Sequence, residues 1–434
     1  MADSAPSLRD LFRVFGRIGC LSFGGPAAQI ALMEDELVTR RDWLSQDTFL
    51  RALSFCMLLP GPEAMQLATY AGWRLHGVWG GLLAGTLFVA PGAAVIFGLA
   101  ALYISYGDQP VVREAFLGVQ ATVIMVVVAA LGRLSQKALN GREGRVIAAL
   151  AFAAIFALGL PFPVIVFAAG AYGALTVSAP PTRDTREATP PTHTPATPQA
   201  RRGDSPPSPT LLATLGGLWG LPLLGLWFLG GGFLLAVAVF FSQLAVVTFG
   251  GAYAVLGYMT QTVVQDEGWI TTEAMIAALG LAETTPGPLI LVTQFVGVLA
   301  GHAVGGWPMA VAAGLLTLWV TFLPCFLWIF AGAPYLERLT NAPRVAGALR
   351  AVTAAVVGVI ANLSLWFALH VIFAEVSPVP VAMAELPYPD WTSLRPLALL
   401  YGALAALLLF RAGRGIVPTL LIVTGLALAV ALAT

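Results

Sequence analysis

Ser22-Phe23-Gly24-Gly25-Pro26 and Leu59-Pro60-Gly61-Pro62-Glu63 are the two stretches that decide the fold, because both return later in the chain. A shift of 226 residues places Phe23-Gly24-Gly25 on Phe249-Gly250-Gly251 and Pro60-Gly61-Pro62 on Pro286-Gly287-Pro288. The same shift pairs Trp43 with Trp269 and His76 with His302. Chance would seldom align so many helix-breaking residues. We therefore expect a duplicated unit whose two copies each carry two breaks inside apolar segments.

The composition is that of a membrane protein. Of the 434 residues, 58% are hydrophobic and only 10% are charged, whereas soluble domains carry about 25% charged residues. Several apolar runs exceed the roughly 18 to 20 residues that are needed to cross a bilayer. The formal net charge is zero, which gives no basis for a nucleic-acid partner. No cleavable signal peptide is visible at the N-terminus.

Sequence motifs for catalysis or metal binding are missing. The single lysine, Lys137, is not part of a Walker A loop, and neither H-E-x-x-H nor G-x-S-x-G occurs. Three isolated cysteines and four histidines favour neither a disulfide framework nor a metal centre. We therefore expect no enzymatic activity and no cofactor.

Apolar segments fall into two sets that are separated by a polar stretch. We divide the chain into an N-terminal transporter repeat (1–178), a disordered Pro/Thr/Ser-rich linker (179–210), a connecting transmembrane helix (211–229) and a C-terminal repeat (230–434). About thirteen membrane segments are expected, near 11–32, 49–75, 77–106, 114–138, 145–160, 162–178, 211–229, 233–258, 272–300, 303–333, 345–373, 396–410 and 415–433. The pairs 145–178 and 396–433 are short, and each is either two tilted helices or a re-entrant hairpin.

Basic residues indicate the orientation of the chain. With the N-terminus in the cytoplasm, most arginines lie on the cytoplasmic side and the acidic 374–394 loop lies outside. The connecting helix has no partner in the first repeat, so it inverts the second copy. The expected fold is an all-α polytopic membrane protein, an inverted repeat of two helical halves with broken or re-entrant helices. Such transporters bind substrate near the bilayer midplane, at the repeat interface.

The breaks supply the chemistry of the expected site. The half-helix that follows a break begins with unpaired N–H groups and a positive dipole end, which suit an oxyanion; a purely structural kink is the alternative. Hydroxyl and amide side chains near the breaks can donate further hydrogen bonds, or can simply join helices. We expect the substrate-binding residues to be Ser22, Phe23, Gly24, Gly25, Pro26, Gln29, Pro60, Gly61, Pro62, Gln66, Thr248, Phe249, Gly250, Gly251, Thr284, Thr285, Pro286, Gly287, Pro288 and Gln294.

Four charged or titratable residues complete the expected site. Glu63 and Glu283 lie inside expected spans, where acids usually serve a function, and we expect them to couple transport to protons. Glu63 has an alternative role, because it can complement the dipole of its own helix. Arg74 and His76 are expected at the cytoplasmic rim, either attracting anions or snorkelling to the interface.

These residues resemble the chromate ion transporter family in its long two-domain form. The resemblance is carried by Ser22-Phe23-Gly24-Gly25-Pro26-Ala27-Ala28, Arg40-Arg41-Asp42-Trp43-Leu44, Leu58-Leu59-Pro60-Gly61-Pro62, Phe249-Gly250-Gly251, Gly268-Trp269-Ile270 and Thr285-Pro286-Gly287-Pro288. It implies export of chromate across the bacterial inner membrane, driven by an ion gradient rather than by ATP; we expect protons as the coupling ion. Transport of sulfate or another oxyanion, an anion channel, and a scaffold without flux are the alternatives. The expected partners are the oxyanion, protons and the lipid bilayer, and a homodimer is compatible with the sequence.

Overall fold

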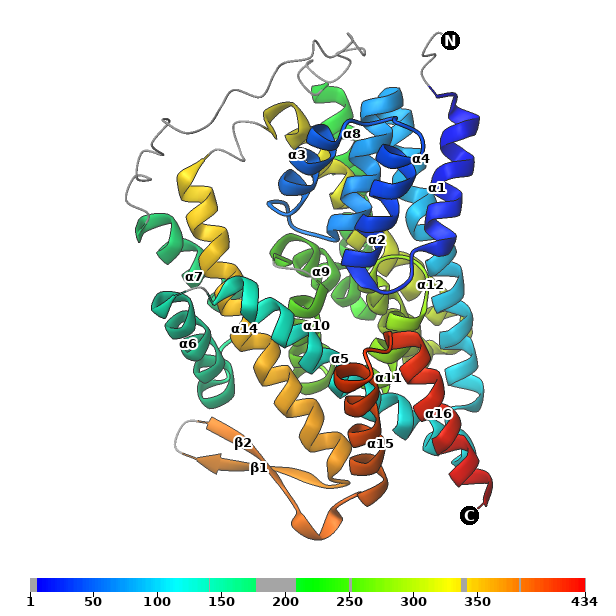
Figure 1. The fold of residues 1–434 in the computed structure, drawn as a ribbon, viewed down its shortest axis with the longest axis vertical. Helices are drawn as coiled ribbons and strands as arrows, with labels where there is room; N and C mark the ends of the chain where they lie inside the picture. Colours follow the sequence, from blue (N-terminus) through cyan, green and yellow to red (C-terminus); the bar gives the residue numbers. More distant parts are fainter. Residues whose placement is uncertain are drawn as a thin grey trace.

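The computed structural model describes residues 6–139, 141–176, 208–249, 252–336, 342–381 and 384–433. These residues form a bundle of helices with a single two-stranded sheet at the end opposite the N-terminus (Figure 1). Six helical segments within the described ranges are long and apolar enough to cross a bilayer: Glu63–Tyr106, Pro110–Ala138, Pro209–Phe228, Leu289–Tyr335, Pro343–Ile372 and Ile416–Ala433. The expected all-α polytopic membrane fold is confirmed, whereas the number of thirteen segments stays a prediction.

In the first repeat, three short helices precede the first long helix. Its elements are α1 (Leu8–Leu21), α2 (Gly25–Glu34), the π-helical turn η1 (Asp35–Thr39), α3 (Gln46–Cys56), α4 (Glu63–Tyr106), α5 (Pro110–Ala138), α6 (Arg142–Leu158) and α7 (Phe162–Thr176). Most of the expected linker lies outside the described residues. The connecting helix is present as α8 (Pro209–Phe228).

The second repeat follows the same order of elements. It contains α9 (Gly232–Val247), α10 (Ala252–Thr260), the π-helical turn η2 (Gln261–Asp266), α11 (Thr272–Thr284), the 3₁₀ turn η3 (Leu289–Leu291), α12 (Val292–Gly332), the 3₁₀ turn η4 (Ala333–Tyr335), α14 (Pro343–Ile372), α15 (Pro396–Ala406), the π-helical turn η6 (Leu407–Arg411) and α16 (Ile416–Ala433). Helix α14 packs against α5, α6 and α7, so the two repeats share one core. The matching π-helical turns, which begin at Asp35 and Gln261, preserve the shift of 226 residues.

The constant shift is wrong beyond the second pair of breaks. Helix α4 begins directly after Pro62, whereas η3 inserts three residues between Pro288 and the start of α12. The long helices then fold back at equivalent places, since Gly77 (φ 63°, ψ −153°) matches Gly306 (φ 64°, ψ −158°). The structural shift is therefore 229 residues here, and His76 is not the counterpart of His302.

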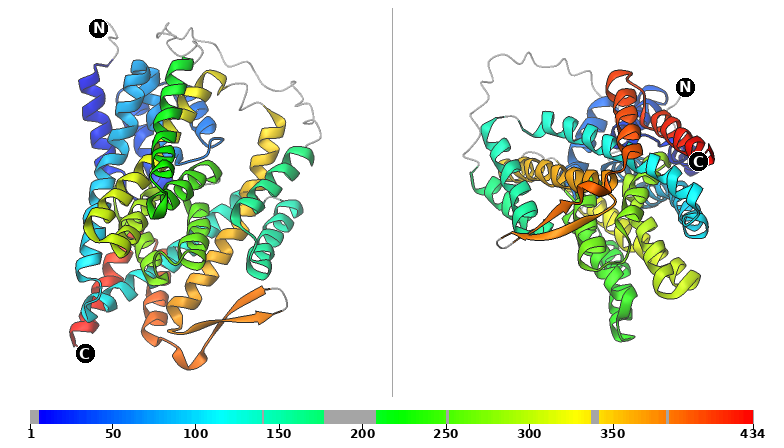
Figure 2. Two further views of the ribbon diagram at one scale, coloured as in Figure 1. Left: turned by 180° about the vertical axis from the view of Figure 1, so that it is seen from behind. Right: turned by 90° about the horizontal axis from the view of Figure 1, so that it is seen from below.

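The expected breaks inside the segments 11–32 and 49–75 are confirmed. Each consists of two helices that meet at a break, α1 with α2 and α3 with the first part of α4. A straight helix of 44 residues would be about 66 Å long, twice the thickness of the hydrocarbon core, and α4 instead turns back at His76–Gly77. Helices α1 to α3 lie toward the N-terminal end of the molecule, whereas α10 and α11 lie toward the other end (Figures 1 and 2).

A β-hairpin replaces the loop that was expected at 374–394. Strands β1 (Val376–Val381) and β2 (Ala384–Pro389) pair in antiparallel fashion, and the 3₁₀ turn η5 (Trp391–Ser393) follows. Thr392 donates two hydrogen bonds to Asp390, which lower the pKa of that exposed carboxyl from its usual value. The hairpin lies at the end of the molecule away from the N-terminus (Figure 1).

Candidate functional site

The two repeats are joined at their breaks by a reciprocal pair of backbone hydrogen bonds. The amide of Gly61 donates to the carbonyl of Thr248 over 3.0 Å, and the amide of Gly287 donates to the carbonyl of Ser22 over 3.0 Å. Under the 226-residue shift, Gly61 corresponds to Gly287 and Ser22 to Thr248. Each Pro-Gly-Pro break therefore satisfies a carbonyl that the first break of the other repeat leaves free.

Each Pro-Gly-Pro break also packs on the long helix of the other repeat. A Cβ atom on Gly61 would lie 2.9 Å from the Sγ atom of Cys325 in α12, and one on Gly92 of α4 would lie 2.1 Å from the carbonyl oxygen of Pro286. Both φ angles in the breaks are positive, 115° at Gly61 and 92° at Gly287, and side chains are disfavoured there. The sequence therefore uses glycine at these places for close approach as well as for conformation.

Two glutamines of the first repeat bind the backbone at these crossing points. Gln29 donates from Nε2 to the carbonyls of Gly287 (2.6 Å) and Ser22 (3.2 Å). Gln66 donates from Nε2 to the carbonyl of Pro60 over 2.7 Å. Both side chains are buried, and their Oε1 atoms have no protein partner. Their counterparts in the second repeat are the apolar Val255 and Phe295, so these two carboxamides come from the first repeat.

The start of α2 leaves backbone amides without a side-chain cap. Gly24 (φ 87°) and Gly25 (φ 78°) precede Pro26, and no side chain caps this helix. The first N–H groups of a helix have no intrahelical partner, which leaves the amides of Gly24, Gly25 and Ala27 for another acceptor. Gly24 is exposed, and Phe23 is 40% exposed beside it.

The expected hydroxyl donors are already engaged. Ser22 donates to Ile18 and Thr248 to Leu244, each within its own helix. Thr284 and Thr285 likewise donate to carbonyls at the end of α11. These four hydroxyls would have to rotate before they could bind a substrate.

The remaining residues that were expected to bind the substrate differ in how deeply they are buried. Gln294 is buried in α12 with an unpaired Oε1 atom, and Phe249 is half-buried at the end of α9. Pro60 and Pro62 are half-buried, whereas Pro286 and Pro288 are buried. Gly250 and Gly251 lie outside the described residues, so the second-repeat counterpart of the α2 start is not placed.

The two expected coupling acids occupy different environments. Glu283 is 3% exposed near the end of α11; its Oε1 atom accepts the hydroxyl of Tyr253, while Oε2 is unpartnered. Glu63 is half-buried and begins α4, where the field of Lys137 reaches it. Tyr253 was missed in the sequence because it lies thirty residues from Glu283 on another helix.

The expected rim residues lie where α4 folds back. Arg74 and His76 are half-buried, and the His76 ring hydrogen-bonds to the carbonyl of Pro6. His76 therefore holds the start of the described chain against the turn of α4.

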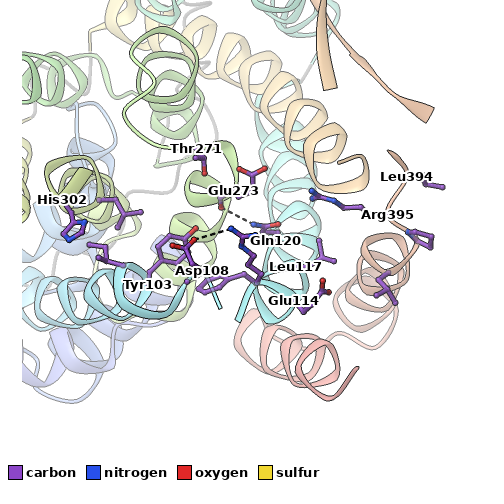
Figure 3. A pocket seen from close by; sticks show the side chains of 17 residues that line it. Tyr103, Asp108, Glu114, Leu117, Gln120, Thr271, Glu273, His302, Leu394 and Arg395 are labelled. Carbon is purple, nitrogen blue, oxygen red and sulfur yellow. Dashed lines mark hydrogen bonds and ion pairs between the residues drawn. The ribbon is translucent and has the colours of Figure 1, made fainter. Parts of the chain in front are cut away.

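A water-accessible cavity that the sequence did not reveal lies at the opposite end of the molecule. It has a volume of about 950 Å³ and receives side chains from the ends of α4, α5, α11 and α15. Figure 3 shows Gln120 bonded to the carbonyl of Glu273 (3.3 Å) and the ion pair between Asp108 and Arg113 (3.5 Å). Its charged or titratable residues come from the junction of α4 and α5, from the starts of α11 and α15, and from His302 of α12, so no single motif marks it.

A profile of the family described as "Chromate transporter" matches residues 9–174 and 235–431, which include both pairs of breaks and exclude the linker. The chain belongs to the chromate transporter family. Relatives in this family include the chromate transport protein of Pseudomonas aeruginosa, which is 32% identical over 82% of this chain and 79% of its own length. A probable chromate transport protein of Synechococcus elongatus is 29% identical over 82% of this chain and 84% of its own length. The chromate transport protein of Cupriavidus metallidurans is 28% identical over 82% and 81%, respectively. No solved structure matches this member of the family.

Proposed function

We propose that this protein exports chromate from the bacterial cytoplasm across the inner membrane in exchange for protons, with its N-terminus in the cytoplasm. Membership of the chromate transporter family and the relatives named for chromate transport support the substrate. The helical fold with inverted, broken helices supports a carrier rather than a scaffold.

The observation that carries the proposal is the uncapped start of α2 beside the crossing of the two repeats. Backbone amides around a turn that joins left-handed and right-handed residues can form a concave anion site. The turn from Gly24 and Gly25, whose φ angles are positive, into helix α2 supplies the amides of Gly24, Gly25 and Ala27. The amides of Gly61 and Gly287 are already bonded across the repeats. At the start of α4, the carboxylate of Glu63 would repel a dianion. We therefore assign the oxyanion mainly to the start of α2.

The reciprocal bonds support a proposal of alternating access. They hold the breaks of both repeats together at one place, while the long helices α4 and α12 pack on opposite breaks. A rocking of one repeat against the other about this place would open the α2 start first to one side of the membrane and then to the other. Glu283, buried and bonded to Tyr253, is our principal candidate for the coupling proton.

The test is flux in liposomes that contain the purified protein. We expect chromate to accumulate against its gradient when a pH difference is imposed, and sulfate to compete, because both are tetrahedral dianions. Sulfate accumulation without chromate flux would show that the substrate is sulfate rather than chromate. Flux that never concentrates chromate would indicate a channel, and absence of flux would contradict a transport function.

A further inference from the structure

A second cavity lies near the hairpin end of the molecule, where the end of α6 meets the second repeat. It has a volume of about 560 Å³ and lies between η2, the end of α14 and the β-hairpin. Asp266 and His370 line it together with Pro378 of the hairpin. Farther in, its walls carry the carboxamides of Gln261, Gln265 and Asn362. Such walls can hydrogen-bond water without fixing an ion.

A small lobe adjoins this cavity. The lobe shares Gln261, Gln265 and Asn362 with the larger space and extends to Gly257 and Thr260 of α10. Its volume of about 20 Å³ is enough for one water molecule. Thr260 is 2% exposed, and its hydroxyl has no protein partner. An unpartnered hydroxyl at the end of a polar cavity is positioned to exchange a hydrogen bond with that water.

The same face of α10 leads from Thr260 to Tyr253. Residues spaced by three and four lie on one face of a helix, so Tyr253, Gly257 and Thr260 form one stripe. Val359 of α14 packs on Gly257 between the two hydroxyls, because a Cβ atom on Gly257 would lie 2.7 Å from the Val359 side chain. The stripe ends at Tyr253, whose hydroxyl donates to Glu283.

We propose that this cavity is the route by which protons from the hairpin side of the membrane reach Glu283, through Thr260 and Tyr253 and separately from the oxyanion site at α2. The inference rests on the proton coupling of the proposed function. Each hydroxyl releases one proton as it accepts one, so a single proton arrives at the carboxylate and neither hydroxyl changes its charge. The cavity brings water as far as Thr260, and its lining includes neither Tyr253 nor Glu283. The proposed step from Thr260 to Tyr253 therefore needs water that enters between α10 and α14, beside Val359.

The charges around the route are consistent with protons rather than oxyanions. Glu283 faces Tyr253 from α10 and the positive field of Arg133 from α5. At the outer end, Asp266 lies in the field of Glu267, and His370 lies in that of Glu273. These acids would repel a dianion and attract a proton. The route and the α2 start therefore serve different ions.

Thr260→Val tests the route, because it keeps the shape of the side chain and removes a hydroxyl that has no protein partner. We expect chromate accumulation driven by a pH difference to fall about tenfold or more. Exchange of chromate for chromate at equal pH, which needs no net proton movement, is expected to stay within about twofold. Thr424→Val removes another buried, unpartnered hydroxyl, on α16, and is the matched control; we expect it to change neither assay.

A second variant keeps the inference testable if Thr260→Val does not fold. In a chain without Cys20, Cys56 and Cys325, Asn362→Cys would place a thiol in the cavity wall. A membrane-impermeant thiol reagent on the hairpin side is expected to block pH-driven accumulation and to spare exchange. Equal loss of both activities, or no loss of either, would overturn the route. A wild-type protein that transports chromate regardless of pH would overturn the coupling and the route but not chromate transport, whereas wild-type protein without flux would contradict the function itself.

Discussion

The carbonyl of Ser22 lies 3.0 Å from the amide of Gly287, and the same carbonyl accepts the side chain of Gln29, which also binds the carbonyl of Gly287. These three residues close a ring of hydrogen bonds between the first break of one repeat and the second break of the other. In hydrocarbon, broken backbone survives only if its polar groups find such partners. The ring therefore explains how two interrupted helices can persist inside the protein.

Gln29→Leu breaks this ring and leaves the carbonyl of Gly287 without its side-chain donor. A buried polar group that loses its partner costs about 1–3 kcal/mol, so we expect a lower midpoint of thermal unfolding and reduced chromate flux. Gln46→Leu changes an exposed glutamine on α3 and serves as the control. An unfolding midpoint for Gln29→Leu equal to that of the control would show that the ring adds no stability.

Gly92→Ala tests the packing of the second break on α4. The new Cβ atom would lie 2.1 Å from the carbonyl oxygen of Pro286, and backbone cannot yield as a side chain can. Overpacking of this kind typically costs about 1–3 kcal/mol. Gly98→Ala, on the same helix with no atom within 4 Å of the added carbon, should be neutral or stabilising. Equal thermal stability of the two variants would contradict the close approach.

Gly24→Ala tests the start of α2. A residue with a Cβ atom at φ 87° costs about 1–2 kcal/mol in this left-handed region, and relaxation would turn the free amides away from the substrate. We expect a raised KM for chromate with folded protein still recoverable. Gly16→Ala on α1, where the added carbon meets nothing within 4 Å, is the control. An unchanged KM for Gly24→Ala would place the oxyanion elsewhere.

Tyr253→Phe tests whether Glu283 or Glu63 carries the coupling proton. The substitution removes the hydroxyl that donates a hydrogen bond to Glu283. It changes neither Glu63 nor Lys137, whose charge acts on Glu63. If Glu283 carries the coupling proton, pH-driven accumulation should fall by about tenfold or more with chromate exchange retained. Accumulation that survives Tyr253→Phe but is lost in Glu63→Gln would transfer the coupling role to Glu63.

The sequence predicted the breaks well because Gly-Pro and Pro-Gly-Pro have few other uses inside apolar segments. The three-residue insertion Leu289–Leu291 escaped notice, because an apolar 3₁₀ turn resembles the helix that follows it. The folding back of α4 was predicted, because the expected segments 49–75 and 77–106 meet at residue 76, and Gly77 is the residue that permits the turn.

Contacts between distant segments were beyond the reach of sequence patterns. Nothing near Gly61 in the chain indicates that its amide is bonded to Thr248, and nothing near Glu283 indicates Tyr253. The cavity that ends at Thr260 is likewise assembled from η2, α14 and the unexpected β-hairpin. Local patterns revealed where the helices are interrupted. Tertiary structure decides which groups form hydrogen bonds with the backbone amides and carbonyls at these interruptions.

The inverted orientation of the two repeats is the central claim, and a labelling map of the membrane protein tests it most directly. Gln46→Cys and Glu267→Cys place thiols at exposed positions beside the equivalent residues Trp43 and Trp269, in a chain without its three native cysteines. With a membrane-impermeant reagent, we expect Gln46→Cys to react only from the cytoplasmic side and Glu267→Cys only from the opposite side. Reaction of both thiols from the same side would contradict the inverted repeat.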